Sequence, residues 1–158
     1  MTRLLFLIVP LFILALMNAP LIAANVDGEA LVIDGKTLEV GGKRFRLFGI
    51  DAPDLGQTCR WPNKDIPCGK ISKTAMMDLV AQTRVTCAPM KGTRAGIRLA
   101  RCSASGFDIA RNMVHTGWAL AFRPESTLYV DTESKAKAAR RGLWKGEFTL
   151  PWVWRRGR

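Results

Sequence analysis

The sequence predicts an α+β domain that is mainly β, with five short strands and about three helices. Three observations support this class. Short apolar runs separated by glycine-containing turns follow residue 28, two further runs of the same kind begin near residues 84 and 97, and helical spacing of apolar residues is confined to three longer segments. A chain of 158 residues has room for one domain with a single hydrophobic core.

The first 24 residues have the pattern of a signal peptide. Arg3 precedes an apolar run from Leu4 to Leu16, and the small pair Ala23-Ala24 ends the segment. We therefore expect cleavage after Ala24, one mature domain over residues 25–158, and export to the periplasm or the medium. An uncleaved anchor is the alternative. The apolar run is short for a transmembrane span and no second hydrophobic segment follows, so we expect no stable membrane span after cleavage.

The chain is strongly basic, with a formal net charge of +11. Without Arg3 the mature domain would carry about +10, and the basic residues are dense over Lys135 to Arg141 and at the C-terminal end. Such a field favours a polyanionic partner, which nucleic acid, an acidic polysaccharide or an anionic membrane surface satisfies equally. A merely soluble basic surface is the alternative, and charge identifies no protein partner. Trp152 and Trp154 alternate in the basic tail, which predicts that they share one face.

Four cysteines follow the expected cleavage site: Cys59, Cys68, Cys87 and Cys102. An even count in an exported chain predicts two disulfides, for which three pairings are possible. Cys59 with Cys68 would close a short loop, and Cys87 with Cys102 would face each other across a hairpin, so we expect these two pairs. A zinc site is the alternative, although the spacings are too wide for zinc knuckles and the chain has one histidine.

The expected strands begin with a β-meander over residues 30–33, 37–40 and 44–50, connected by turns at Asp34-Gly35 and Gly41-Gly42. The later elements follow in order: a loop over 53–69, a helix over 71–83 with Ser72 as its candidate cap, strands over 84–87 and 97–102 joined by a loop around Gly92, and helices over 107–117 and 128–141. This arrangement is consistent with a closed OB-type barrel with helices packed on it, although periodicity alone allows other small α+β folds.

Short motifs extend over nearly the whole mature chain: Asp34-Gly35-Lys36-Thr37, residues 46–54 (Arg-Leu-Phe-Gly-Ile-Asp-Ala-Pro-Asp), Gln57, Leu99-Ala100-Arg101-Cys102, Gly117-Trp118-Ala119 and Gly142-Leu143-Trp144. Their order and spacing resemble the thermonuclease (staphylococcal nuclease-like) family. This resemblance implies the five-stranded OB-type barrel. The tail over residues 151–155 is also similar to thermonuclease-like proteins associated with succinoglycan, an acidic exopolysaccharide.

The resemblance implies a site for phosphodiester hydrolysis. Family members hold calcium on carboxylates, use a glutamate to activate water, and clamp the phosphate with two arginines, because each of these groups matches the charge or proton that the reaction must handle. Carried onto this sequence, Asp51 keeps a metal carboxylate, Ala52 offers the backbone carbonyl of the neighbouring ligand, and Arg46 keeps the first clamp position.

Lys36 stands where the resemblance requires the other metal carboxylate, two residues after Asp34. A positive charge in the first shell opposes calcium binding strongly. The ammonium could take the cation's place and pair with Asp51, or it could turn into solvent and leave a weakened site. Calcium is therefore the cofactor that the resemblance suggests, and Lys36 argues for none.

The catalytic base and the second clamp also differ from the family pattern. Asp54 occupies the glutamate position with one methylene fewer, so its carboxylate would stop about 1.5 Å short, and a misplacement of that order costs roughly a hundredfold in rate. Ile97 occupies the second arginine position, whose loss costs roughly 10³ to 10⁵. Arg98 should face away from the site unless the register changes, whereas Arg94 could fold back from its loop.

Two hypotheses follow. The first is an exported, thermonuclease-like protein with a degraded nuclease site that binds a polyanion or a partner and contributes to exopolysaccharide (succinoglycan) biosynthesis. Its candidate polyanion contacts are Arg46, Arg94, Arg98, Arg155 and Arg156. The second is an active calcium-dependent nuclease with a rearranged site, motivated by the intact Asp51 and Arg46. Turnover of single-stranded DNA with millimolar calcium distinguishes the two.

Overall fold

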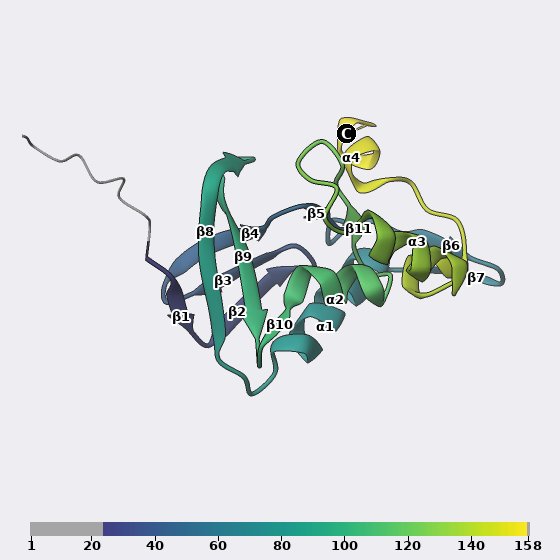
Figure 1. The fold of residues 1–158 in the computed structure, drawn as a ribbon. Helices are drawn as coiled ribbons and strands as arrows, with labels where there is room; N and C mark the ends of the chain where they lie inside the picture. Colours follow the sequence, from purple (N-terminus) through teal and green to yellow (C-terminus); the bar gives the residue numbers. More distant parts are fainter. Residues whose placement is uncertain (1–23, 158) are drawn as a thin grey trace, which may run out of the picture.

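The structure is a computed structural model that describes residues 24–157 (Figure 1). The expected signal peptide therefore lies outside the described residues except for Ala24. Within the described range, no helix combines the length and the apolar character that crossing a membrane requires.

Seven strands form the main sheet of the described chain: β1 (Val26–Gly28), β2 (Ala30–Asp34), β3 (Thr37–Val40), β4 (Lys43–Leu47), β8 (Val85–Arg94), β9 (Ile97–Ala104) and β10 (Phe107–Asp108). The order is β1-β8-β9-β4-β3-β2, with β10 paired to β9. The β4–β9 ladder is parallel, and the other ladders are antiparallel. Only Glu29 separates β1 from β2, so the two ends of this order are successive segments of one bent strand. The mixed sheet thus has the expected OB-type arrangement, but the expected closure of the barrel is wrong, because no ladder joins β1 to β2.

The five expected strands are confirmed, and the second hairpin is longer than expected. β8 continues to Arg94, with a register irregularity between Pro89 and Thr93, so the turn lies at Ala95-Gly96 and not around Gly92. Pro89 lacks a backbone N–H for the ladder, and strands accommodate such a residue at a bulge. Arg94, which was predicted to lie in the loop, is therefore the last residue of β8.

The three expected helices are present as α1 (Cys68–Val80), α2 (Ile109–His115) and α3 (Val130–Ala138). The sequence did not predict a fourth short helix, α4 (Pro151–Trp154), or the 3₁₀ turns η1 (Gly142–Lys145) and η2 (Arg155–Gly157). Ser72 is not the cap of α1, because the helix begins at Cys68, directly after Pro67. Ser72 is instead buried and donates to the Trp118 carbonyl over 2.7 Å. This hydrogen bond connects α1 to the segment that follows α2.

Two further strand pairs lie outside the main sheet. β5 (Ile50–Asp51) pairs with β11 (Leu120–Ala121), and β6 (Cys59–Trp61) pairs with β7 (Lys64–Ile66). The β6–β7 hairpin lies inside the segment that was expected to be a loop. Its strands are too short for periodicity to reveal them.

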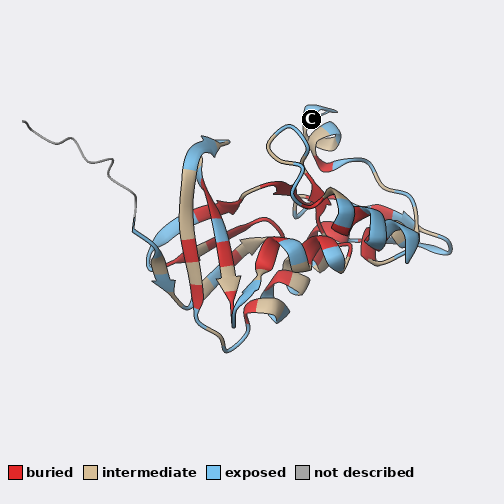
Figure 2. Cartoon of the chain, in the orientation of Figure 1, coloured by how far each residue is buried: buried red, intermediate tan, exposed pale blue. Residues whose placement is uncertain are grey.

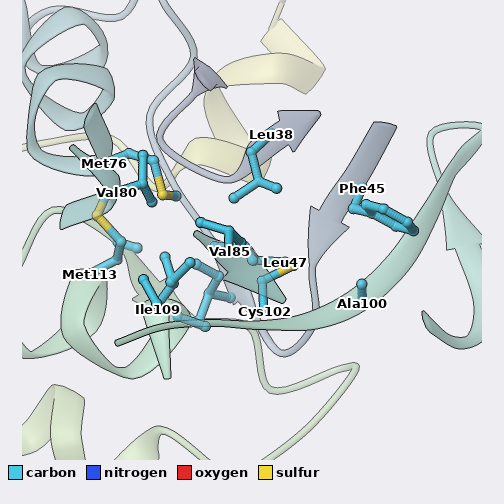
Figure 3. Close-up of a cluster of buried hydrophobic side chains, with 14 of the residues drawn as sticks. Leu38, Phe45, Leu47, Met76, Val80, Val85, Ala100, Cys102, Ile109 and Met113 are labelled. Carbon is cyan, nitrogen blue, oxygen red and sulfur yellow. The ribbon is translucent and has the colours of Figure 1, made fainter. Parts of the chain in front are cut away.

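The core fills the space between the sheet and the helices, and buried residues, coloured red, recur along β8 and β9 (Figure 2). Figure 3 shows how side chains from the strands and from α1 and α2 meet there, with Leu38, Leu47 and Val85 beside Met76 and Ile109. A second, smaller cluster lies where β6 and β7 meet η1. The members of this cluster that are buried are Cys59, Ile66, Cys68, Leu120 and Leu143.

Both disulfides form as expected, one in each core cluster. Cys87 bonds Cys102 across β8 and β9, and Cys59 bonds Cys68 between β6 and the first residue of α1. No cysteine is free, so the zinc alternative is wrong. The first bridge closes a loop of 15 residues and the second a loop of 9.

Replacing both Cys87 and Cys102 by alanine is expected to lower the free energy of unfolding by about 3 kcal/mol, because the unfolded chain regains the entropy of a 15-residue loop. Replacing both Cys59 and Cys68 should cost slightly less, about 2.5 kcal/mol, since its loop is shorter. Urea denaturation of the oxidised wild type and the two double variants measures both values. Equal stability of all three proteins would contradict this prediction.

The turn between β2 and β3 is held directly against α1. A Cβ atom on Gly35 would lie 1.9 Å from Ser72 Oγ and 3.2 Å from Ala52 Cβ, so only glycine fits this close approach. The backbone of the next residue, Lys36, is thereby fixed beside the segment that contains Ala52. Its side chain cannot reach solvent and is 2% exposed.

Candidate functional site

Three aspartates lie close together around shared cations. Asp34 ends β2, Asp51 ends β5, and Asp54 lies in the loop that follows. Asp51 is completely buried, whereas Asp54 keeps partial access to solvent. The positions that the family resemblance assigned to metal and base are thus close in space, and their chemistry depends on the cations around them.

Lys36 points into this cluster. Its Nζ donates to the Ala52 carbonyl over 2.8 Å, forms a direct ion pair and hydrogen bond with Asp54, and lies 3.7 Å from an Asp34 carboxylate oxygen. The expected pairing with Asp51 is therefore wrong, and so is the alternative in which Lys36 turns into solvent. The ammonium contacts the carbonyl of Ala52 because the Gly35 turn directs the lysine toward that segment.

Asp51 is held by two arginines. Arg46 Nη2 donates to its Oδ1 over 3.0 Å, and Arg155 binds its other oxygen. Arg155 also donates to Asp54 Oδ1 over 3.0 Å, so one guanidinium bridges both carboxylates. Burial by itself would lower the pKa of Arg155, but the hydrogen bonds and charges of the two aspartates raise it above its ordinary value. We call Lys36, Arg46, Asp51, Asp54 and Arg155 the site network.

Asp54 is correspondingly stabilised as a carboxylate. Burial alone would raise its pKa, but the hydrogen bond and charge of Lys36, together with those of Arg155, lower it below the ordinary value of 3.8. A carboxylate with a lowered pKa and two cationic partners is a poor acceptor for a proton from water.

Arg94 folds back toward this cluster, as one of the two possible replacements for the missing clamp. Its Nη2 donates to the Ile50 carbonyl over 2.5 Å, and its guanidinium lies 3.5 Å from Glu125 and 4.5 Å from the centre of the Phe122 ring. Burial, followed by the charge of Arg46, lowers the pKa of Arg94. Arg94 is therefore a second buried guanidinium beside the first clamp position.

Two other arginines that were expected to contact a polyanion, Arg98 and Arg156, lie outside the site network. Arg98 is exposed and opposite Phe45 in the β9–β4 ladder, so it does not replace the clamp at Ile97. Arg156 is exposed on η2. These two side chains remain available to a ligand, whereas Arg46 and Arg94 are mostly enclosed by protein.

Sequence reasoning did not predict that the C-terminal segment covers the site. Trp152 packs edge-on against Phe122 with ring centres 5.5 Å apart, and Gln57 donates to the Thr149 carbonyl over 2.6 Å. The predicted shared face of Trp152 and Trp154 is wrong, because these residues lie in helix α4 and not in an extended segment. No local pattern identified these contacts, which join positions far apart in the sequence.

The mixed sheet and the helices packed on it define a mainly β domain of the OB type. The profile of the family described as "Staphylococcal nuclease homologue" matches residues 44–146, and the chain belongs to this family. It is similar to the succinoglycan biosynthesis protein ExoI of Rhizobium meliloti (strain 1021), with 32% identity over 129 residues, 79% of this chain and 68% of that protein. It is also 32% identical over 119 residues to the probable staphylococcal-like nuclease CAN3 of Oryza sativa subsp. japonica, which corresponds to 72% of this chain and 28% of that protein.

The family is calcium-dependent in general, but the residues present here do not fit calcium. The ion requires six to eight oxygen ligands, and most of those must come from free carboxylates, carbonyls and water. Here the Ala52 carbonyl and Asp54 face an ammonium, and both oxygens of Asp51 face guanidinium groups. No group of three or more His, Cys, Asp or Glu residues in the described range is arranged to hold a metal ion.

Replacing Lys36 by methionine is expected to raise the pKa of Asp54, because its largest favourable partner is lost while burial remains. In the wild type the folded pKa lies below the ordinary 3.8, so this pair stabilises the fold above that pH and the contribution is lost as pH falls through the folded pKa. NMR titration of the Asp54 carboxyl carbon measures both midpoints. A lower midpoint in Lys36→Met than in the wild type would contradict the pairing.

Proposed function

We propose that this chain is an exported, thermonuclease-like protein that has no calcium-dependent nuclease activity and binds a polyanion as an accessory in acidic exopolysaccharide biosynthesis. One observation is the main support for the proposed loss of activity. The Lys36 ammonium contacts the carbonyl and the carboxylate that the family resemblance assigns to metal and base. A cation that belongs to the chain thereby satisfies the groups that calcium would need.

The remaining parts of the site support the same conclusion. Hydrolysis needs a base that takes a proton from water, and Asp54 is already paired with Lys36 and Arg155. It also needs free guanidinium donors for the phosphate, but Arg46 is committed to buried Asp51. Losses within one catalytic unit leave a residual rate set by what remains, so we expect hydrolysis near background.

Export and polyanion binding are supported by separate observations. The two disulfides are typical of chains that fold in an oxidising compartment. The net charge of +11 favours a polyanion, and Arg98 and Arg156 are exposed to meet one. The similarity to a succinoglycan biosynthesis protein, named after an acidic polysaccharide, supports polysaccharide over nucleic acid as the polyanion.

An active nuclease is the second candidate, and one observation favours it. Arg94 folds back beside Arg46, so two guanidinium groups are present near the phosphate position despite Ile97. Such a nuclease would still have to displace Lys36 and Arg155 from the carboxylates before a metal could bind.

The decisive assay uses the oxidised chain lacking residues 1–24, single-stranded DNA and millimolar calcium. We expect no turnover above that of a mock preparation, and no change when the calcium is chelated. Turnover that requires calcium, and that is lost in a folded Asp51→Asn variant, would refute the proposal and establish the nuclease. Circular dichroism of the variant provides the folding control.

A further inference from the structure

A separate pocket of about 420 Å³ lies between the β6–β7 hairpin and the segment that contains η1. We call it the hairpin pocket. Its main lining residues are Arg60, Trp61, Arg140, Trp144, Lys145 and Glu147. None of them belongs to the site network, and the volume is within the range of pockets that bind small molecules.

The walls of the hairpin pocket are joined firmly. Arg60 and Glu147 exchange two backbone hydrogen bonds of 2.8 and 2.7 Å, and Gly146 packs so closely that a Cβ atom there would lie 2.1 Å from the Arg60 carbonyl oxygen. The disulfide of Cys59 and Cys68 fixes the hairpin on its other side. The pocket is therefore held in shape before a ligand arrives, which reduces the entropic cost of binding.

The chemistry of the pocket combines aromatic rings with cations. Lys145 Nζ lies 5.1 Å from the centre of the Trp61 ring, and Arg60, Arg140 and Lys145 outnumber the single carboxylate, Glu147. The indole N–H groups of Trp61 and Trp144 are buried without a hydrogen-bond partner.

Arg140 supplies an independent indication of function. It follows the last turn of α3 with φ +49°, in the left-handed region where glycine or asparagine is favoured after a helix. An arginine in this conformation carries a backbone cost on the order of 1 kcal/mol or more. Its side chain lines the hairpin pocket, so binding by that side chain would explain why the strain is present.

We propose that the hairpin pocket binds a negatively charged sugar unit of an acidic polysaccharide. A sugar ring packs against the tryptophans, its carboxylate meets Arg140 and Lys145, and its hydroxyl groups donate to Glu147. A phosphodiester chain has no donor on its phosphates for Glu147, and strand binding uses an extended groove with successive stacking platforms, whereas this pocket is bounded by one hairpin and the segment around η1. The inference rests on the proposed polyanion-binding function and assigns it a specific site.

The test uses the oxidised chain without residues 1–24 and an alginate hexasaccharide, a uronate oligomer, as the probe. We expect saturable binding by calorimetry and shifts of the Trp61 and Trp144 indole resonances in NMR spectra. Arg140→Gly removes the side chain and relieves the backbone, so it should keep or raise the melting temperature and weaken binding about tenfold. Lys43→Ala, which removes an exposed cation at the start of β4 and outside the pocket, is the matched control and should change affinity less than twofold.

Three outcomes would overturn the hairpin pocket as a saccharide site. Equal weakening by Arg140→Gly and Lys43→Ala would indicate diffuse charge attraction, and the polyanion function would stand without the pocket. Equal or tighter binding of a (dT)₆ oligonucleotide, with the same indole shifts, would assign the pocket to nucleic acid. Failure of the hexasaccharide, of long-chain alginate and of single-stranded DNA to bind at low salt would refute the proposed function as well. Maltohexaose, an uncharged oligosaccharide, should bind at least tenfold more weakly than the uronate.

Discussion

Replacing Asp51 by alanine is expected to lower the free energy of unfolding by about 3–5 kcal/mol, because it leaves the buried Arg46 without its carboxylate. The side chain of Arg46 is 8% exposed and that of Asp51 is 0% exposed, so water cannot replace the lost partner without opening the barrel end. Arg155 loses its contact with Asp51 in the same variant. Urea denaturation of wild type and variant measures the difference.

The matched control is Asp65→Ala, which removes an ion pair of the same type and length from the surface. Arg60 and Asp65 are 3.0 Å apart, with side chains 66% and 58% exposed. Exposed pairs contribute about 0.2–1 kcal/mol, so this variant should remain close to the wild type.

The sign of the Asp51→Ala effect distinguishes the site network from an ordinary calcium site. In a metal site without its ion, clustered carboxylates repel each other, and removing one of them relieves that repulsion. Here the carboxylates alternate with cations, and removing one leaves a positive charge unpaired. An Asp51→Ala variant as stable as the wild type, or more stable, would mean that the site network does not form.

Local patterns were sufficient for the barrel strands and the disulfides. The turns at Asp34-Gly35 and Gly41-Gly42 mark strand ends by their own chemistry, and the Cys87–Cys102 pair follows from two strands joined by a hairpin. The β6–β7 hairpin and α4 were missed because segments of three or four residues contain fewer than two full periods of the strand or helix pattern, too few for a repeat to be recognised.

The sequence predicted that several of these charged residues lie close together, but it did not predict which of them pair. The family resemblance placed Lys36 among the carboxylates, but the lysine pairs with Asp54 and not with the expected Asp51. Arg155 was expected to bind a polyanion and instead contacts Asp51, 104 positions earlier in the chain. Its approach depends on the path of the segment after η1, which carries no periodic signal. Which cation meets which carboxylate is thus a property of tertiary structure, because charge alone makes all of these pairs equally favourable.

Replacing Lys36 by aspartate and Arg155 by alanine together is expected to create a calcium site with a dissociation constant of about 10⁻⁴ to 10⁻³ M, whereas the wild type binds none in this range. Lys36→Asp supplies the missing carboxylate and frees the Ala52 carbonyl, whereas Asp54 is freed only when Arg155 is removed as well. Arg155→Ala frees the second oxygen of Asp51. Calorimetric titration of calcium into the oxidised chain measures the affinity.

The calcium affinities of the two single variants test whether both changes are needed. In Lys36→Asp, Arg155 still bridges Asp51 and Asp54, and in Arg155→Ala the Lys36 ammonium still contacts the carbonyl and Asp54. Because each cation blocks a different set of oxygens, the gain in affinity should be strongly non-additive, as expected for residues that share partners. Calcium at about 100 times the dissociation constant should then stabilise only the double variant, by about 2.7 kcal/mol. If Lys36→Asp binds calcium as tightly as the double variant, Arg155 does not block the site. If the wild type binds calcium measurably, Lys36 does not block it either.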